Sequence, residues 1–193
     1  MDHSNGYEAR ADDFIRLRGT DPYGIGAGVL QRWVKQLPAG AEVLDVGCGT
    51  GVPVTQVLLG AGMRVWGIDA SPTLLAAFRE RFPGAEAVCE AAETSGYFGR
   101  TFDAVVACGL LFLLSDGNQE AVLRKWALLL RPGARLLFTA PQQVAEWTDV
   151  LTGAPCRSLG EDRYYELLRE AGLTPAESYT DRGDNHYFQV LRP

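Results

Sequence analysis

Residues 43–51 read VLDVGCGTG, the segment of the chain that says most about its fold. It begins with apolar residues, as a buried strand does, and continues with Gly47, Gly49 and Gly51. Glycines at alternate positions let the backbone turn sharply and leave no side chain to obstruct a ligand. Because residues 53–59 then follow helical spacing, the stretch predicts a strand, a ligand-binding loop and a helix in that order.

The spacing of these glycines separates two classes of ligand. In the dinucleotide-binding pattern G-x-G-x-x-G, a first glycine at Gly47 would put the third at Val52, but the third lies one position earlier, at Gly51. Asp45 stands two residues before Gly47, where its charge would repel a pyrophosphate and tolerate a cationic sulfonium ligand that carries an ammonium group. The spacing therefore favours S-adenosylmethionine over a nicotinamide dinucleotide, and an NAD-dependent oxidoreductase is the weaker alternative.

Strand-like and helix-like segments alternate after this loop, which is typical of a mostly parallel α/β sheet. Residues 1–25 suggest an N-terminal helix or arm. Residues 131–133, Arg-Pro-Gly, are expected to form a turn, and residues 141–160, which lack clean periodicity, an insertion over the edge of the sheet. Strands are expected near residues 42–46, 64–68, 85–89, 102–108, 134–140, 174–179 and 187–191, and the last two can form an antiparallel hairpin.

An acidic residue follows the second expected strand. Asp69 lies 18 residues past Gly51, where a carboxylate can accept hydrogen bonds from both hydroxyls of a ribose, as acidic residues do in nucleotide-binding Rossmann folds. The alternative role is to cap the next helix, but Ser71, followed by Pro72, is the stronger capping residue. We therefore interpret Asp69 as a ribose-binding residue.

Four segments occur in the order found in one enzyme family: VLDVGCGTG, VWGIDASP, FDAVVACGLLFLL and LRPGARLLFTAP. Over roughly residues 28–193 the chain resembles the class I S-adenosylmethionine-dependent methyltransferases, and in particular those that act on small molecules. The resemblance implies an α/β fold, with a single Rossmann-like, doubly wound domain, a seven-stranded and mostly parallel sheet, an antiparallel last strand and helices on both faces. The expected parts are an arm at 1–27, a cofactor-binding core at 28–140, an acceptor-side insertion at 141–160 and a C-terminal helix and hairpin at 161–193.

The resemblance also implies which residues would hold S-adenosylmethionine. Gly47 and Gly49 would pass close to its methionine part, which Asp45 would orient. Asp69 would bind the ribose, and the backbone near Cys108 would bind the ammonium group. Where the family often has an acidic residue and a small one to meet adenine, this chain has a Glu-Ala pair. The full set of expected cofactor-binding residues is Asp45, Gly47, Cys48, Gly49, Asp69, Ala70, Ser71, Glu90, Ala91 and Cys108.

The methyl acceptor is expected to lie outside this common core. The apolar residues from Leu110 onward suggest a site for an organic molecule, since the Asn/Asp-Pro-Pro-aromatic motif of enzymes that methylate nucleobase amino groups is absent there. His186 is a candidate general base near neutral pH, although a hydrogen bond to its own loop or strand end is at least as simple a role. Tyr7 and Trp147 have packing roles as alternatives. The expected substrate-binding residues are Tyr7, Leu110, Trp147, His186 and Tyr187.

The composition narrows the classes of function. With 18 basic and 24 acidic residues the net charge is −6, and no run of Lys or Arg offers a face for nucleic acid. The four cysteines have no C-x-x-C spacing and only two histidines are present, so no metal site is expected. Neither a signal peptide nor an apolar run of about 20 residues is visible. These features predict a cytoplasmic protein without membrane contact, as a monomer or a homodimer.

The sequence therefore predicts transfer of the methyl group of S-adenosylmethionine to an oxygen, nitrogen or sulfur atom of a small molecule. This in-line displacement depends mainly on alignment of the reacting groups. The alternatives are a methyltransferase for protein or peptide side chains, and a protein that binds S-adenosylmethionine without catalysis.

Overall fold

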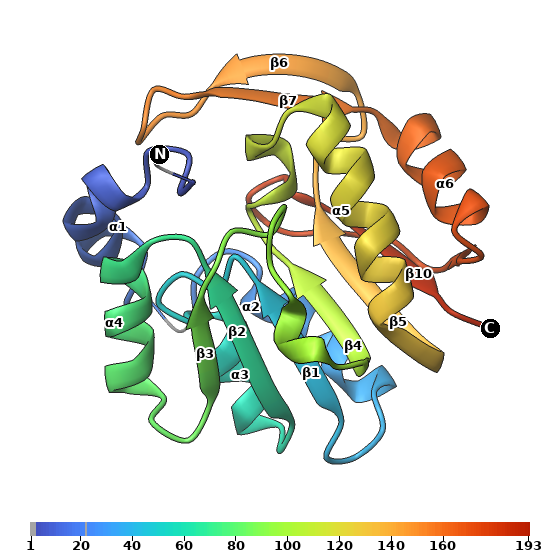
Figure 1. Cartoon of the computed structure of the whole chain (residues 1–193), viewed down its shortest axis with the longest axis horizontal. Coiled ribbons are helices and arrows are strands. Elements are labelled where there is room, and N and C mark those ends of the chain that lie inside the picture. Colours follow the sequence, from blue (N-terminus) through green and yellow to red (C-terminus); the bar gives the residue numbers. More distant parts are fainter. Residues whose placement is uncertain (1–2, 22) are drawn as a thin grey trace.

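A computed structural model describes residues 3–21 and 23–193. The main sheet has the strand order β3-β2-β1-β4-β5-β10-β8, and a short β9 pairs beside it with β10 (Figure 1). The strands are β1 Glu42–Val46, β2 Arg64–Asp69, β3 Glu86–Cys89, β4 Phe102–Ala107, β5 Leu130–Thr139, β6 Val144–Thr148, β7 Pro155–Leu159, β8 Thr174–Pro175, β9 Tyr179–Thr180 and β10 His186–Leu191. The α-helices are α1 Ala11–Leu17, α2 Ala27–Trp33, α3 Val54–Gly60, α4 Pro72–Arg81, α5 Asp116–Leu129 and α6 Glu161–Glu170, and the 3-10 helices are η1 Glu8–Arg10, η2 Val34–Gln36, η3 Tyr97–Gly99 and η4 Leu111–Leu113.

The predicted α/β architecture is confirmed. Strands β1 to β5 pair in parallel, and β10 runs antiparallel to β5. Strand β1 has β2 on one side and β4 on the other, so the order of the strands reverses at its carboxyl end. In open α/β sheets the crevice at such a reversal is where ligands bind, and the glycine loop leaves β1 at this point.

Helices cover both faces of the sheet because its central strands carry buried apolar side chains on both sides. Neighbouring residues of β1 point to opposite faces: Leu44 packs in the cluster that includes α5 and α6, and Val43 in the cluster that includes α2 and α3. Trp126 of α5 and Trp33 of α2 are fully buried on the two sides. Burying a large apolar side chain contributes about 1.5–3 kcal/mol, so these two layers hold the sheet rigid beneath the glycine loop.

The structure differs from the sequence predictions in three places. Residues 144–159 form a two-stranded antiparallel hairpin, β6–β7, rather than an irregular insertion. The expected turn at 131–133 is wrong, since these residues belong to β5, where Gly133 N–H donates to the Arg192 carbonyl. The expected strand at 174–179 is split into β8 and β9, which are separated by residues 176–178.

The N-terminal arm, η1 with α1, lies beside α4 (Figure 1). The Glu8 carboxylate accepts hydrogen bonds from Ser71 Oγ at 2.5 Å, from Thr73 Oγ1 at 2.7 Å and from Thr73 N–H at 3.1 Å. A carboxylate at a helix N-terminus is favoured by the free N–H groups and the helix dipole. The arm is therefore tied to the first turn of α4, directly after β2.

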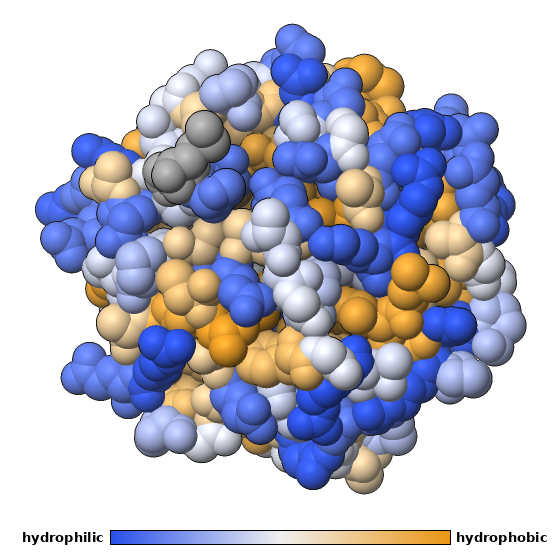
Figure 2. Space-filling view, in the orientation of Figure 1, coloured by the Kyte–Doolittle hydropathy of each residue, from blue (hydrophilic) through white to orange (hydrophobic). Residues whose placement is uncertain are grey.

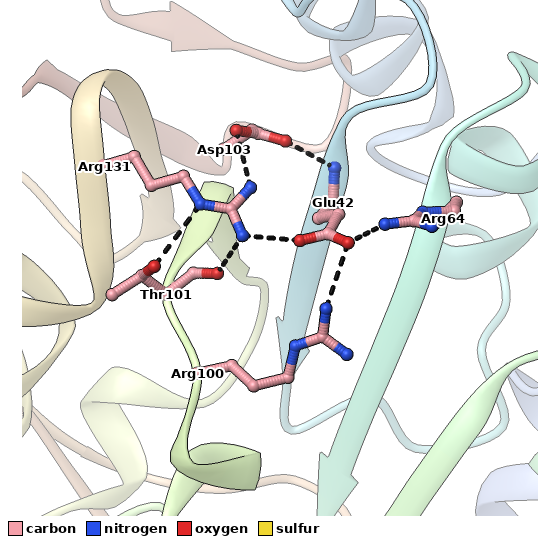
Figure 3. A network of polar contacts seen from close by, with 6 residues as sticks. All are labelled: Glu42, Arg64, Arg100, Thr101, Asp103 and Arg131. Carbon is pink, nitrogen blue, oxygen red and sulfur yellow. Dashed lines mark hydrogen bonds and ion pairs between the residues drawn. The ribbon is translucent and has the colours of Figure 1, made fainter.

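The amino ends of the parallel strands carry a polar network (Figure 3). Glu42, 7% exposed, forms ion pairs with the guanidinium groups of Arg64, Arg100 and Arg131. Arg131 also contacts Asp103 at 2.9 Å, and Asp103 accepts the Glu42 N–H at 2.8 Å. In the orientation of Figure 1, the visible surface of the molecule is mostly hydrophilic, with hydrophobic residues gathered in patches between the hydrophilic ones (Figure 2).

Candidate cofactor and acceptor site

A cavity lies at the carboxyl ends of β1, β2 and β4, where the strand order reverses; we call it the main cavity. Its floor is the glycine loop, and its walls come from the turns after β2, β3 and β4, from the N-terminal arm and from the β6–β7 hairpin. The lining residues are His3, Ser4, Asn5, Tyr7, Phe14, Arg18, Gly47, Gly49, Ile68, Asp69, Ala70, Leu74, Glu90, Ala92, Glu93, Cys108, Gly109, Leu110, Phe112, Leu113 and Asp149.

Glycine is required at different positions of the loop for different structural reasons. Gly47 has φ +72°, and a Cβ there would lie 3.1 Å from Leu110 Cβ, so a side chain would narrow the cavity. Gly51 has φ +80°, and its Cβ would lie 2.4 Å from Phe82 Cε2, in the packing against α4. Gly47 and Gly49 line the main cavity. The third glycine serves close packing, a role that the motif alone does not distinguish from ligand contact.

Asp45 lies beneath the loop and not in the cavity wall. It is 1% exposed, and its Oδ2 accepts a hydrogen bond from Thr55 Oγ1 at 2.7 Å. Burial raises the pKa of the Asp45 carboxyl to about 7, against a smaller lowering by the Thr55 hydroxyl. This buried acid fixes the glycine loop to the start of α3 and leaves a negative or readily ionised group below the cavity.

Asp69 lies in the cavity wall and joins two loops. Its Oδ2 accepts the Gly49 N–H at 2.8 Å, and its Oδ1 accepts the Ser71 N–H at 2.8 Å. Burial raises the pKa of the Asp69 carboxyl, while these two N–H groups lower it. Each carboxylate oxygen has a second lone pair, so Asp69 can still accept bonds from a ligand. Ser71 caps α4 by accepting the Leu74 N–H at 3.1 Å, which confirms its predicted capping role.

The wall after β3 is acidic. Glu90 and Glu93 face the main cavity together with Asp69 and Asp149, whereas Arg18 is the arginine that lines it. Glu90 also accepts hydrogen bonds from Ser95 Oγ at 2.6 Å and Gly96 N–H at 3.2 Å, which fix its position. The excess of acids favours a cationic ligand over a pyrophosphate. A recess shares Ala70 and Glu90 with the main cavity and adds the predicted Ala91.

The wall after β4 carries Cys108, Gly109 and the predicted Leu110. Burial raises the pKa of the Cys108 thiol well above its usual range, so it stays protonated. Gly109 N–H donates to Thr139 Oγ1 at 2.7 Å, which joins the ends of β4 and β5. Cys48, by contrast, lies outside the cavity and packs with Leu75 and Phe78.

The arm and the β6–β7 hairpin meet over the main cavity. The Tyr7 hydroxyl donates to Asp149 Oδ2 at 3.1 Å, and the Tyr7 and Phe14 rings contact edge to face with centroids 5.8 Å apart. Asp149 itself accepts the N–H groups of Leu151 and Thr152. Two segments that are distant in the sequence thus form the roof. Tyr7, predicted as a substrate-binding residue, lines the same cavity as several of the predicted cofactor-binding residues.

A second cavity adjoins the main one; we call it the His186 cavity. It lies between η4, the segment after β5, strand β6 and the loop before β10. Phe112 lines both cavities. The lining residues are Phe112, Thr139, Ala140, Pro141, Gln142, Gln143, Trp147, Thr180, Asp184, Asn185 and His186.

The predicted substrate-binding residues therefore do not all line one cavity. Tyr7 and Leu110 line the main cavity, and Trp147 and His186 line the second. Tyr187 lies in neither: it is buried with the α2 and α3 cluster, and its hydroxyl donates to Asp181 Oδ2 at 2.9 Å. The alternation of side chains along β10 explains this, because adjacent residues of a strand face opposite sides.

The described residues were also compared with the requirements of a metal site and of a membrane-spanning helix. Among the residues that the structure describes, no group of three or more His, Cys, Asp or Glu side chains could hold a metal ion. Within residues 3–21 and 23–193, no helix is long and apolar enough to cross a membrane.

Comparison with known proteins adds independent findings. Residues 43–133 match the family described as methyltransferase domain. An O-methyltransferase of Aspergillus sclerotiorum is 30% identical over 165 residues, covering 76% of this chain and 60% of that protein. A ubiquinone biosynthesis O-methyltransferase of Xanthomonas axonopodis pv. citri is 34% identical over 152 residues, covering 70% and 60%. The chain thus spans about three fifths of the length of these curated relatives.

Solved structures show the same fold. An amino pentose methyltransferase of Micromonospora echinaspora, solved with S-adenosylmethionine, has a TM-score of 0.73 at 20% identity and covers 94% of this chain and 96% of its own. The N-methyltransferase NodS of Bradyrhizobium japonicum, solved with S-adenosylhomocysteine, has a TM-score of 0.72 at 18% identity over 100% of both chains. At these identities the likeness is one of fold.

Proposed function

We propose that the chain is a class I S-adenosylmethionine-dependent methyltransferase that transfers the methyl group of this cofactor to a small molecule, as its match to the methyltransferase domain over residues 43–133 supports. The observation that carries the proposal is the main cavity: an acid-lined space at the strand reversal, floored by Gly47 and Gly49 and joined to Asp69. Relatives named as O-methyltransferases and a fold neighbour named as an N-methyltransferase keep oxygen and nitrogen acceptors in the proposal.

The residues present fit this cofactor. The free lone pairs of Asp69 suit the two ribose hydroxyls, and Ala70, Glu90 and Ala91 form a recess that suits the adenine. The open floor at Gly47 and the wall at Cys108 would hold the methionine part. A molecule with one sulfonium and one ammonium group is matched by the acidic wall.

When bound, S-adenosylmethionine supplies a methyl group on a positively charged sulfur. This sulfur leaves as a neutral thioether, so the leaving group needs no protonation. The chain contributes alignment. Asp69 holds the glycine loop against the turn after β2, and Asp45 holds the same loop against α3 through Thr55. The Tyr7–Asp149 contact closes the roof and limits the access of water. Such positioning supplies about 7–11 kcal/mol in the best intramolecular cases.

Calorimetric titration of S-adenosylhomocysteine into the wild type and Asp69→Ala tests this function. We expect measurable binding to the wild type and at least a tenfold loss in Asp69→Ala, because two ribose hydrogen bonds to a charged group disappear, each contributing about 1.5–3 kcal/mol. Asp162→Ala, an exposed acid on α6, is the matched control and should bind like the wild type. Equal affinities for Asp69→Ala and the wild type would remove the ribose assignment, and no binding to the wild type would overturn the proposal.

A further inference from the structure

The His186 cavity contains a buried polar side chain with unmet hydrogen-bonding capacity. His186 is 8% exposed, and within the described part of the chain neither ring nitrogen has a hydrogen-bond partner. Leaving a buried donor or acceptor without a partner costs about 1–3 kcal/mol. The ring is held in place by Phe188, whose centroid lies 4.5 Å away in an edge-to-face contact. His186 therefore lines the cavity as a fixed imidazole whose two buried nitrogens have no partner among the described residues, and a ligand in the cavity could supply one.

The protonation state of this histidine defines the ligand group it can meet. Burial lowers the pKa of His186, against a smaller raising by Glu161, so the ring is neutral at pH 7. A neutral imidazole has one N–H donor and one nitrogen acceptor. A hydroxyl group satisfies either nitrogen, because it both donates and accepts a hydrogen bond.

The lining of the same cavity also includes two aromatic side chains, Phe112 and Trp147. The Phe112 and Trp147 rings lie with centroids 5.4 Å apart and planes inclined by 48°. Both side chains are half-buried, whereas Trp33, Trp66 and Trp126 are at most 5% exposed. Aromatic surface left open to a cavity favours a flat apolar or aromatic ring, since such pairs add about 0.5–1.5 kcal/mol beyond burial.

Charge limits the ligand further. Of the described residues that line this cavity, Asp184 alone carries a charged side chain, and none is Lys or Arg. A carboxylate or phosphate would meet no positive partner there and would be repelled. The cavity also adjoins the main one through Phe112, and through Thr139, which accepts the N–H of Gly109 in the main cavity wall.

We propose that the His186 cavity binds the methyl acceptor, and that the acceptor is an uncharged aromatic compound whose hydroxyl hydrogen-bonds to His186 while its ring lies against Phe112 and Trp147. That the bound compound accepts a methyl group rests on the proposed methyltransferase function. That the cavity binds an uncharged aromatic hydroxyl compound rests on the residues of the cavity alone. His186 and Trp147 are then residues that determine specificity for the acceptor.

Nitrogen NMR of the histidine rings tests the site directly, because the chain has only His3 and His186. The full chain, labelled with ¹⁵N-histidine and saturated with S-adenosylhomocysteine, is titrated with catechol and separately with benzoate. The His186 signals are identified by their loss in His186→Phe. We expect catechol to shift them and benzoate to leave them unchanged. Equal shifts with benzoate, or none with catechol, would overturn the proposal.

Variants connect the cavity to its ligand. We expect at least tenfold weaker catechol binding by His186→Phe and by Trp147→Ala. Val144→Ala, on the same strand as Trp147 but 80% exposed, should bind catechol like the wild type. All three should bind S-adenosylhomocysteine within twofold of the wild type. Unchanged catechol binding in both cavity variants contradicts the site.

The two proposals fail in different ways. If wild type does not bind S-adenosylhomocysteine, the proposed function fails, while catechol titration without it still reports on the cavity. If catechol binds but incubation with S-adenosylmethionine yields no methylated catechol, the acceptor assignment is overturned.

Discussion

Buried acidic residues have different partners at the two ends of the parallel sheet. At the amino ends, Glu42 is surrounded by three guanidinium groups, and Asp103 completes the network (Figure 3). At the carboxyl ends, burial raises the pKa of both Asp45 and Asp69, whose bonds come from a hydroxyl and from backbone N–H groups. At the amino ends the charges are neutralised within the chain, whereas the acids at the carboxyl ends have no cationic partner in the bonds described, and it is at this end that we propose the cofactor binds.

The largest expected effect is at the paired end. Glu42→Ala leaves three guanidinium groups close together without their carboxylate, and breaking a buried ion pair costs about 3–5 kcal/mol. Because the arginines are 36–63% exposed, we expect the lower limit, about 3 kcal/mol of unfolding free energy. Urea unfolding measures this loss. Arg64→Ala, the most exposed partner, should lose about 1 kcal/mol or less, and an equal loss in the two variants would contradict the network's role.

A smaller effect on the unfolding free energy is expected at Asp45, where the acid is buried without a cationic partner. Its folded pKa of about 7 exceeds the value of 3.8 for a free carboxyl, so between these values the folded state binds more protons than the unfolded state. Stability therefore falls as pH rises, by about 2 kcal/mol between about pH 5.5 and 7. Asp45→Asn should remove this slope in unfolding measurements at several pH values, while Asp162→Asn keeps it. Parallel pH profiles for wild type and Asp45→Asn would show that the acid is not strained by burial.

The roof of the main cavity gives the smallest expected effect. Tyr7→Phe removes the hydroxyl that donates to Asp149, a contact worth about 1 kcal/mol. We expect about 1 kcal/mol less unfolding free energy and three- to tenfold weaker S-adenosylhomocysteine binding, because the N-terminal arm is no longer tied to the hairpin above the cavity. Tyr23→Phe, 76% exposed, is the control. Equal affinity in Tyr7→Phe and wild type would mean that the arm does not close over the ligand.

The carboxyl end of β1 was predictable because its signals are local. The strand, the glycine loop, Asp69 and the capping Ser71 lie within 29 residues of sequence from Val43, and each has its own backbone signature. The separate roles of Gly47 and Gly51 could not be predicted from the motif. A side chain at Gly47 would narrow the cavity, whereas one at Gly51 would disturb the packing against Phe82.

The roof and the second cavity were not predictable in detail because long-range packing forms them. Tyr7 meets Asp149 across 142 positions, and Phe112 meets Trp147 from another element. Along β6 the exposed Val144, Glu146 and Thr148 alternate with half-buried residues, a strand pattern too short and too polar to be recognised. The sequence predicted Trp147 and His186 as acceptor residues, but their shared cavity depends on the fold.

A crystal structure of the chain with S-adenosylhomocysteine would show whether the main cavity is the cofactor site. We predict the ligand in the main cavity, with both ribose hydroxyls within about 3.5 Å of the Asp69 carboxylate, adenine beside Ala70, and the sulfur between Gly47 and Cys108. Ligand density elsewhere, or a ribose beyond hydrogen-bonding distance of Asp69, would contradict the claim that the acid-lined main cavity at the carboxyl ends of the strands is the cofactor site.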